Sequence, residues 1–285
     1  MAGREAAVTE IGGSNTGLAI PLPGSNGGSV TIAWGAGTDV GRRRAANEDS
    51  YVATSPLFAV ADGMGGHSAG DLASAAVVER LAEIVAGDFL APRSIERALE
   101  SATDDISDIA GESELGVGTT VTGAALTMVD GEPYFAIFNI GDSRVYRFER
   151  NELAQVTVDH SLVQQLVDGG VITREQAHNH PDGNVITRAV GFQASPTPDY
   201  WLLPLKAGLR LLVCSDGLTG EIEDERIRLH LAAGLSADET ASALVDAALS
   251  EGGRDNVTVL VVDVTAVPGV EEDGNTAPRA THRAR

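Results

Sequence analysis

The sequence predicts an α+β fold in which layers of helix cover layers of sheet. Short runs rich in β-branched and aromatic residues cluster in the middle of the chain, and stretches with helical apolar spacing come in pairs before and after them. This order differs from the strict strand–helix alternation of a parallel α/β protein. With 285 residues, 43% of them hydrophobic, the chain can bury a substantial core as one domain or two small ones.

Seven runs are expected to be strands, because they are β-rich and several are bounded by Gly or Asp-Gly turns. They are Val30–Trp34, Leu57–Ala61, Thr119–Val129, Tyr134–Ile140, Arg144–Phe148, Arg210–Cys214 and Val257–Val264. Four stretches are expected to be helices, because apolar residues recur in them at three- and four-residue spacing. They are Ala69–Val85, Pro92–Ile109, Glu223–Ala232 and Ala237–Ser250. In the first helix, Leu72 and Leu81 are expected on the packed flank.

Residues 30–266 are expected to form the folded region. Residues 1–29 are rich in Gly, Ser and Asn without periodicity, which predicts a disordered leader, and residues 267–285 are expected to be a disordered polar tail. Residues 161–191 are poor in strand signal and are expected to be a surface insertion with short helices. No internal repeat or linker divides the folded region.

The net charge of −21, from 41 acidic and 20 basic residues, argues against a nucleic-acid or anionic membrane partner, because both require a positive field. Most of this acidity is expected to be a solvated surface, and the placement of the carboxylates decides whether some bind hard cations. Cys214 is the single cysteine, so no intrachain disulfide can form. No apolar run approaches a membrane span of roughly 20 residues, and the polar N-terminus lacks a signal-peptide core. A cytoplasmic monomer is the default expectation.

Several common catalytic motifs are absent from the sequence. A cysteine phosphatase of the Cys-x5-Arg kind would need arginine where Gly220 follows Cys214. Lys206 is the only lysine and is followed by alanine, which excludes a P-loop. His178 and His180 have no neighbouring cysteine or further histidine, so a zinc site is not expected there.

Five short segments each place an aspartate at a turn beside an expected strand. They are Asn47-Glu48-Asp49, Asp62-Gly63-Met64-Gly65-Gly66, Gly141-Asp142-Ser143-Arg144, Ser215-Asp216-Gly217 and Gly253-Arg254-Asp255-Asn256. A strand followed by Asp-Gly brings a carboxylate to the sheet edge, and glycine lets the backbone carbonyl approach an ion. Oxygen ligands suit Mg²⁺ or Mn²⁺, and several carboxylates can hold two such ions. Each segment alone is a good turn sequence, but five together favour a common acidic site.

Together these segments resemble the signature set of the metal-dependent protein serine/threonine phosphatases, the phosphatase 2C (PPM) family, in its bacterial form. The matching elements, in family order across about 36–266, are Arg44-x-x-Asn47-Glu48-Asp49, Asp62-Gly63-Met64-Gly65-Gly66, Gly118-Thr119-Thr120, Gly141-Asp142-Ser143-Arg144, Asp159-His160-Ser161, Ser215-Asp216-Gly217-Leu218 and Asp255-Asn256. The resemblance implies a central β-sandwich of two antiparallel sheets flanked by helix pairs, in α-β-β-α layers, with the metal site at one end. Residues 161–191 then correspond to a flap that influences substrate choice.

The resemblance also implies the ligands of a binuclear metal site. Asp62 would bridge two Mn²⁺ or Mg²⁺ ions, and the Gly63 carbonyl would ligate one of them. Asp216 and Asp255 would complete the other ion. A metal-bridging hydroxide would then attack the phosphate directly, without a phosphoenzyme.

Four further residues take supporting roles by the same resemblance. Glu48 and Asp49 would hold metal-bound waters. Asp142, with Asp216, would bind a third, weaker metal ion. Arg44 would bind the substrate phosphate, which suits its fork-shaped donor, whereas Arg42 and Arg43 are expected to be solvated.

One departure from the family pattern concerns the general acid. Animal members carry a histidine two residues after the bridging aspartate, and Met64 occupies that position here. The role does not transfer to the nearby His67, so the general acid is unassigned. Thr119 and Thr120 are expected to have a structural role.

The predicted function is removal of phosphate from phosphoserine and phosphothreonine in proteins, opposing a Ser/Thr kinase; phosphorylated proteins, including a kinase or its substrates, are the expected partners. Three alternatives are weighed against it. One is a non-catalytic member of the fold that binds phosphoproteins, which the intact Asp62, Asp216 and Asp255 argue against. Another is a phosphatase dedicated to one regulatory partner. The third is a calcium-binding structural protein.

Overall fold

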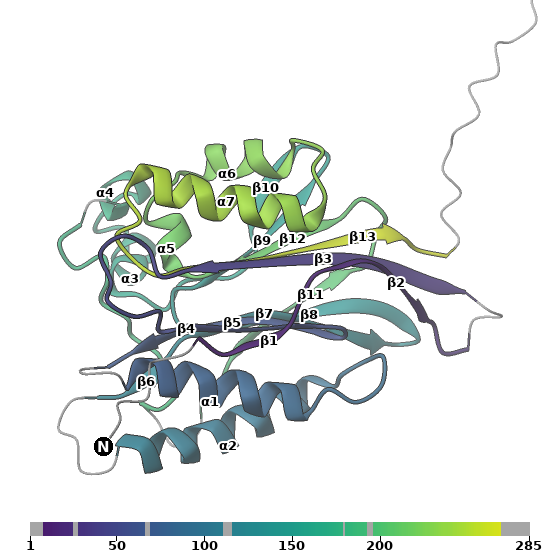
Figure 1. The fold of residues 1–285 in the computed structure, drawn as a ribbon, viewed down its shortest axis with the longest axis horizontal. Helices are drawn as coiled ribbons and strands as arrows, with labels where there is room; N and C mark the ends of the chain where they lie inside the picture. Colours follow the sequence, from purple (N-terminus) through teal and green to yellow (C-terminus); the bar gives the residue numbers. More distant parts are fainter. Residues whose placement is uncertain are drawn as a thin grey trace, which may run out of the picture.

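The structure, a computed structural model, describes residues 8–24, 28–65, 69–110, 116–178, 180–192 and 196–268. Two β-sheets pack face to face, and helices cover the outer face of each sheet (Figure 1). The layers therefore follow the order helix, sheet, sheet, helix, as the resemblance implies.

One sheet lies next to the N-terminal helices. Its strands, in order across the sheet, are β1 (Glu10–Gly12), β4 (Asp49–Thr54), β5 (Leu57–Met64), β7 (Val121–Val129), β8 (Glu132–Ile140) and β11 (Asp199–Pro204), and β6 (Gly118–Thr119) pairs with the end of β5. Neighbouring strands are antiparallel except β1 and β4, which are parallel. The expected antiparallel sheet therefore carries one parallel edge strand.

The other sheet is antiparallel throughout its described strands. In order across the sheet these are β10 (Glu152–Gln155), β9 (Arg144–Glu149), β12 (Arg210–Cys214), β13 (Val257–Ala266), β3 (Ser29–Asp39) and β2 (Asn15–Pro21). Strands from both ends of the folded region therefore lie side by side, because β3 pairs with β13.

Strand alternation divides the apolar residues between two cores. On β5, Phe58 and Val60 point into the space between the sheets, whereas Leu57 and Ala59 pack under the helices. This follows from the two-residue period of a strand, which sends successive side chains to opposite faces. Between the sheets the ring of Phe58 meets the Trp34 ring edge-on, with centroids 5.2 Å apart. A third core lies under the helices of the second sheet.

Each outer face is covered by a helix pair. Helices α1 (Gly70–Glu83) and α2 (Pro92–Ala110) cover the first sheet, while α6 (Asp224–Leu231) and α7 (Ala237–Glu251), with the short α5 (Asp216–Thr219), cover the second. All four expected helices are present. The expectation for Leu72 is wrong, because this side chain is 42% exposed and α1 turns Ala73, Val77 and Leu81 inward instead.

The expectation of a disordered leader is wrong for residues 10–21, which form β1 and β2. Sequence periodicity misses them because Ile20 is their only fully buried side chain, and backbone pairing at the sheet edges holds them. The Tyr51 hydroxyl also donates a hydrogen bond to Glu10. The described residues do not include 1–7, 25–27 or 269–285. These ranges belong to the expected leader and make up most of the expected tail.

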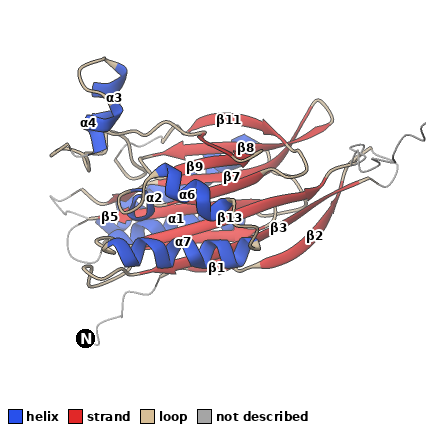
Figure 2. Ribbon diagram, turned by 90° about the horizontal axis from the view of Figure 1, so that it is seen from above, coloured by secondary structure: helices blue, strands red, loops and turns tan. Residues whose placement is uncertain are grey.

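The expected insertion contains α3 (Leu162–Asp168) and α4 (Arg174–His178), which project beyond one end of the sheets (Figure 2). Two isolated bridges, between Ser161 and Ile186 and between Thr119 and Val190, tie this segment to itself and to the sheet. We refer to residues 161–191 as the flap. No helix among the described residues has the length and apolarity to cross a membrane.

Candidate metal and active site

Two aspartates from adjacent strands form the centre of the candidate site. Asp49 opens β4, Asp62 lies near the end of β5, and the two are register partners across the strand pair. Asp49 is 1% exposed, and its Oδ2 accepts a hydrogen bond of 2.8 Å from the Ser215 hydroxyl. Its Oδ1 has no hydrogen-bond partner among the described residues.

The backbone of Asp62 is fixed by the two threonines that follow Gly118. The Asp62 amide donates to Thr120 Oγ1, and the Asp62 carbonyl accepts from the Thr120 amide and the Thr119 hydroxyl. Thr120 Oγ1 also lies 2.8 Å from Ser143 Oγ. These threonines therefore connect the strand that carries Asp62 to the turn that carries Asp142.

Asp142 follows a tight turn between β8 and β9. Gly141 has φ +113°, and a side chain there would also overlap Thr120 at 2.6 Å, so only glycine fits. The Gly141 amide donates to His160 Nδ1, and His160 Nε2, which carries the proton in this tautomer, faces Asp199 at 3.1 Å. The buried Asp142 Oδ1 has no partner among the described residues.

Asp216 begins α5 immediately after β12. Gly217 is required behind it, because a Cβ atom there would lie 1.8 Å from the Asn256 carbonyl oxygen. The Asn256 side chain in turn accepts a hydrogen bond from the Glu48 amide and donates to two backbone carbonyls in the loop that precedes Glu48. The ends of β12 and β13 therefore position both Asp216 and Glu48.

The side chain of Asp255 is 33% exposed. Arg44 Nη2 donates a 2.6 Å hydrogen bond to Asp255 Oδ2, and the Asn256 amide donates to Oδ1. The Arg44 side chain is half exposed. Gly63 lies beside Glu48, since its amide donates to the Glu48 carbonyl, and a Cβ atom on Gly63 would overlap the Gly70 carbonyl oxygen at 2.1 Å.

Burial and mutual repulsion shift the acidity of this cluster. Burial raises the pKa of Asp49 to about 7. Burial, and then the charges of Asp49 and Asp216, raise the pKa of Asp62 well above its usual value. The pKa values of Asp142 and Asp216 are raised in the same direction by burial and by neighbouring carboxylates. Several buried carboxylates within electrostatic reach of each other need either protons or cations to be stable.

The donors in this cluster fit hard divalent cations. They are carboxylate and backbone oxygens, and two of the buried carboxylate oxygens, on Asp49 and Asp142, are unpartnered in the described part of the chain. As they stand, no three His, Cys, Asp or Glu side chains of that part gather closely enough to hold an ion, and Asp255 bonds Arg44 instead.

The structure places each predicted site residue within hydrogen-bond or electrostatic reach of at least one other predicted site residue. Sequence reasoning expected a structural role for Thr119 and Thr120, which hold the Asp62 backbone. It assigned no role to five other polar residues that contact the site, namely Asn47, Ser143, His160, Ser215 and Asn256. These residues could have been found from the sequence, because each lies inside or beside one of the sequence motifs of the predicted site. Arg42 is not free, since it donates to the Leu249 carbonyl. His67 lies outside the described residues.

Comparison with known proteins places this geometry in a family. Residues 36–251 match the family model described as Protein phosphatase 2C. The chain is 41% identical over 243 residues to the serine/threonine protein phosphatase PstP of Mycobacterium tuberculosis, covering 83% of this chain and 46% of that protein. It is 37% identical to the serine/threonine phosphatase stp of Listeria welshimeri, covering 79% of this chain and 93% of that protein. The chain thus spans about half the length of the mycobacterial relative.

Solved structures give the same result. The crystal structure of the Mycobacterium tuberculosis phosphatase PstP/Ppp matches with a TM-score of 0.75 and 39% identity, over 83% of this chain and 100% of that one. The PstP catalytic domain in complex with two manganese ions matches with a TM-score of 0.71 and 39% identity, over 83% and 99%. Serine/threonine phosphatase Stp1 of Staphylococcus aureus matches with a TM-score of 0.74 and 29% identity, over 90% and 100%.

Proposed function

The chain belongs to the protein phosphatase 2C family, and we propose that it hydrolyses phosphoserine and phosphothreonine in proteins with bound Mn²⁺ or Mg²⁺. The observation that carries this proposal is the buried carboxylate cluster around the Asp49–Asp62 pair. The names of the relatives support it, since they are serine/threonine phosphatases, and one related catalytic domain is described with two manganese ions.

In this proposal each carboxylate takes a distinct place around the ions. Asp62, the Gly63 carbonyl, Asp216 and Asp255 hold the two core ions. Two ions bound there supply an acidified water as the nucleophile and neutralise the phosphoryl oxygens.

The remaining acidic residues have supporting roles. Glu48 and Asp49 orient the water molecules around the ions, and Ser215 fixes Asp49 by its hydrogen bond to Oδ2. Asp142, with its unpartnered Oδ1, holds a third and weaker ion together with Asp216.

Arg44 binds the phosphate of the substrate. Its side chain is half exposed and bonds Asp255 at the rim of the cluster, so its guanidinium can turn to a phosphate while staying near the ions. Met64 has no proton to donate to the leaving alcohol, and no side chain is assigned as the general acid.

Phosphorylated proteins are the proposed partners, including a Ser/Thr kinase or the substrates of that kinase. A phosphatase of this kind acts as a cytoplasmic monomer that reverses the action of the kinase. Proteomic comparison of phosphorylated sites with and without the active protein identifies these substrates.

The test is phosphate release from p-nitrophenyl phosphate and from phosphothreonine peptides with Mn²⁺, Mg²⁺ or Ca²⁺. Turnover with Mn²⁺ or Mg²⁺ but not with Ca²⁺ is expected. Tight Ca²⁺ binding without turnover would indicate a structural calcium protein, and phosphopeptide binding without turnover would indicate a non-catalytic member of the fold. Hydrolysis of the small ester but of no general phosphopeptide would indicate dedication to one protein partner.

A further inference from the structure

A cavity of about 740 Å³ lies between the flap and the helices of the second sheet. Asp142 and Asp216 line one side of it, so it opens directly beside the candidate metal site. Its volume is within the range of roughly 300–1,000 Å³ that ligand pockets have. Anything bound in it would therefore lie next to the reacting phosphate.

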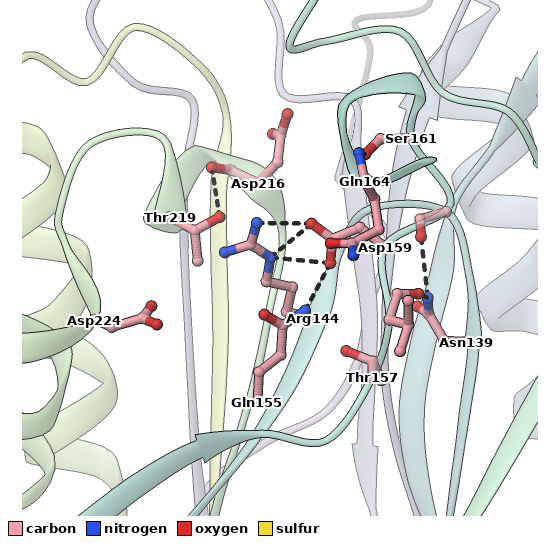
Figure 3. A network of polar contacts seen from close by, with 12 residues as sticks. Asn139, Arg144, Gln155, Thr157, Asp159, Ser161, Gln164, Asp216, Thr219 and Asp224 are labelled. Carbon is pink, nitrogen blue, oxygen red and sulfur yellow. Dashed lines mark hydrogen bonds and ion pairs between the residues drawn. The ribbon is translucent and has the colours of Figure 1, made fainter. Parts of the chain in front are cut away.

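The cavity carries a large excess of negative charge. Arg144, at its base, is already neutralised, because its guanidinium makes hydrogen bonds of 2.6 to 3.1 Å to both carboxylate oxygens of Asp159 (Figure 3). The other charged residues of the lining are five carboxylates and one arginine, Arg174. When Asp142 and Asp216 hold ions, Glu175, Glu223 and Asp224 remain against Arg174, which leaves an excess of two negative charges to attract a cation.

The lining also contains apolar side chains between these charges. Val163 and Val167, on the inner side of α3, are half-buried, and Ile222, just before α6, is buried. A lysine or arginine side chain matches this combination, because its aliphatic stem packs on apolar surface while its charged head reaches carboxylates. A metal ion would gain nothing from the apolar residues and needs far less space.

Helix capping would ordinarily explain the carboxylates near the start of α6, and the structure excludes this explanation for one of them. Acidic residues at a helix N-terminus commonly satisfy free amide groups or interact with the helix dipole. Asp224 accepts a hydrogen bond from the Tyr146 hydroxyl, but Glu223, at the N-cap position, makes no side-chain capping bond and is exposed. On the other wall, the buried Oδ1 of Asp142 has no partner among the described residues. Glu223 is therefore available to a ligand, whereas Asp142 is assigned to the metal site.

We propose that this cavity binds a lysine or arginine side chain of the phosphoprotein substrate, a few residues from the phosphorylated serine or threonine. This rests on the proposed phosphatase function and deepens it, because it makes the flap and the start of α6 a specificity site for basic sequences. Glu175 on α4 and Glu223 before α6 both line the cavity and hold the charged head of that side chain.

The test is a series of neutral phosphothreonine peptides in which a single lysine is moved from four residues before the phosphothreonine to four residues after it. The kcat/KM of the Mn²⁺-loaded protein should rise about tenfold at one or two adjacent positions and stay flat at the others. In Glu175→Gln/Glu223→Gln this maximum should disappear. The matched control, Glu79→Gln/Glu100→Gln, removes the same charge from exposed positions on α1 and α2 and should keep the maximum.

Three results would overturn the proposal. A uniform gain at every position, reduced equally in both double variants, would show attraction by the negative field of the whole protein instead. An unchanged kcat/KM across the series would show that the cavity binds no basic side chain. If p-nitrophenyl phosphate is not hydrolysed, only the proposed phosphatase function is contradicted. The proposal for the cavity is then tested by calorimetric binding of the same lysine series, with a phosphonate in place of the phosphate. A flat affinity series in that experiment would also contradict the proposal.

Discussion

Asp49 and Asp62 face each other as register partners on β4 and β5, so two carboxylates lie side by side on one face of the sheet. Like charges placed directly opposite each other destabilise a strand pair. Here the strands are also buried, and Asp49 has one oxygen without a partner in the described structure. The pair therefore lowers the stability of the fold, and a cation bound there would offset that loss.

The first prediction concerns the stability of the metal-free protein. Burial raises the pKa of Asp49 from 3.8 to about 7. Since the folded-state pKa lies above the unfolded value, the folded protein holds an extra proton between these values, and stability is lost as the pH rises from about 3.8 to about 7. In EDTA, wild-type Tm should fall as the pH rises to about 7 and level off above it, where the unfavourable contribution of Asp49 should reach at most about 4 kcal/mol.

The variant Asp49→Asn isolates this contribution, because asparagine keeps an acceptor for Ser215 and has no charge. In EDTA the variant should lose much of the pH dependence and should be more stable than the wild type at pH 8. Adding Mn²⁺ should raise the Tm of the wild type more than that of the variant. Equal pH slopes for the two proteins would contradict the assignment.

The second prediction concerns Asp216, one of the proposed core ligands. Asp216→Asn removes one negative charge from a site of hard oxygen donors, so Mn²⁺ affinity should fall while the fold remains. At low Mn²⁺, phosphate release should drop by about 100-fold or more. Asp246→Asn, an exposed change of the same kind on α7, is the matched control. Wild-type turnover of Asp216→Asn at low Mn²⁺ would remove Asp216 from the site.

The third prediction separates Arg44 from its neighbours. Arg44→Ala should raise KM about tenfold, and kcat should also fall if the phosphate contact strengthens in the transition state. Arg43→Ala should leave both constants unchanged, and Arg42→Ala should lower stability through its lost bond to Leu249. Equal kinetic effects from all three variants would show a general positive field instead of a specific contact.

The fourth prediction tests whether Asp142 binds an ion or only completes a turn. As a ligand, Asp142→Ala should keep two tight Mn²⁺ ions and near-native stability but lose a weak site and much of its turnover on phosphopeptides. As a turn residue, it should instead lower the free energy of unfolding by about 1 kcal/mol with unchanged kinetics. Calorimetric Mn²⁺ titration beside phosphopeptide kinetics distinguishes these outcomes.

Most of the layered fold follows from the sequence, because long apolar runs carry it. The seven expected strands and four expected helices are all present, with boundaries within a few residues of those expected in most cases. The strands β4, β10 and β11 were not expected, although β4 carries Asp49. Its six residues follow a polar loop directly and are buried on both faces, so they show no alternation of the kind that identifies a strand.

The residues of the site were predictable as a set, whereas their contacts were not. Arg44 and Asp255 lie 211 positions apart in the chain, and their ion pair depends on the pairing of β3 with β13, which brings the loop after β3 next to the loop before β13. The Asn256 contact with Glu48 has the same origin. Such contacts result from tertiary packing, which a local sequence pattern does not report.

The pairing of β3 with β13 sets the order of events during protein synthesis. The ribosome releases β3 long before β13, its partner on one side, which is the last described strand. At roughly 5–20 residues per second, β3 waits roughly ten seconds or more for that partner. Asp255 immediately precedes β13, so the acidic cluster is completed at the same late moment. A nascent chain that lacks this last strand therefore carries no finished site, and activity appears only when synthesis of the domain is nearly complete.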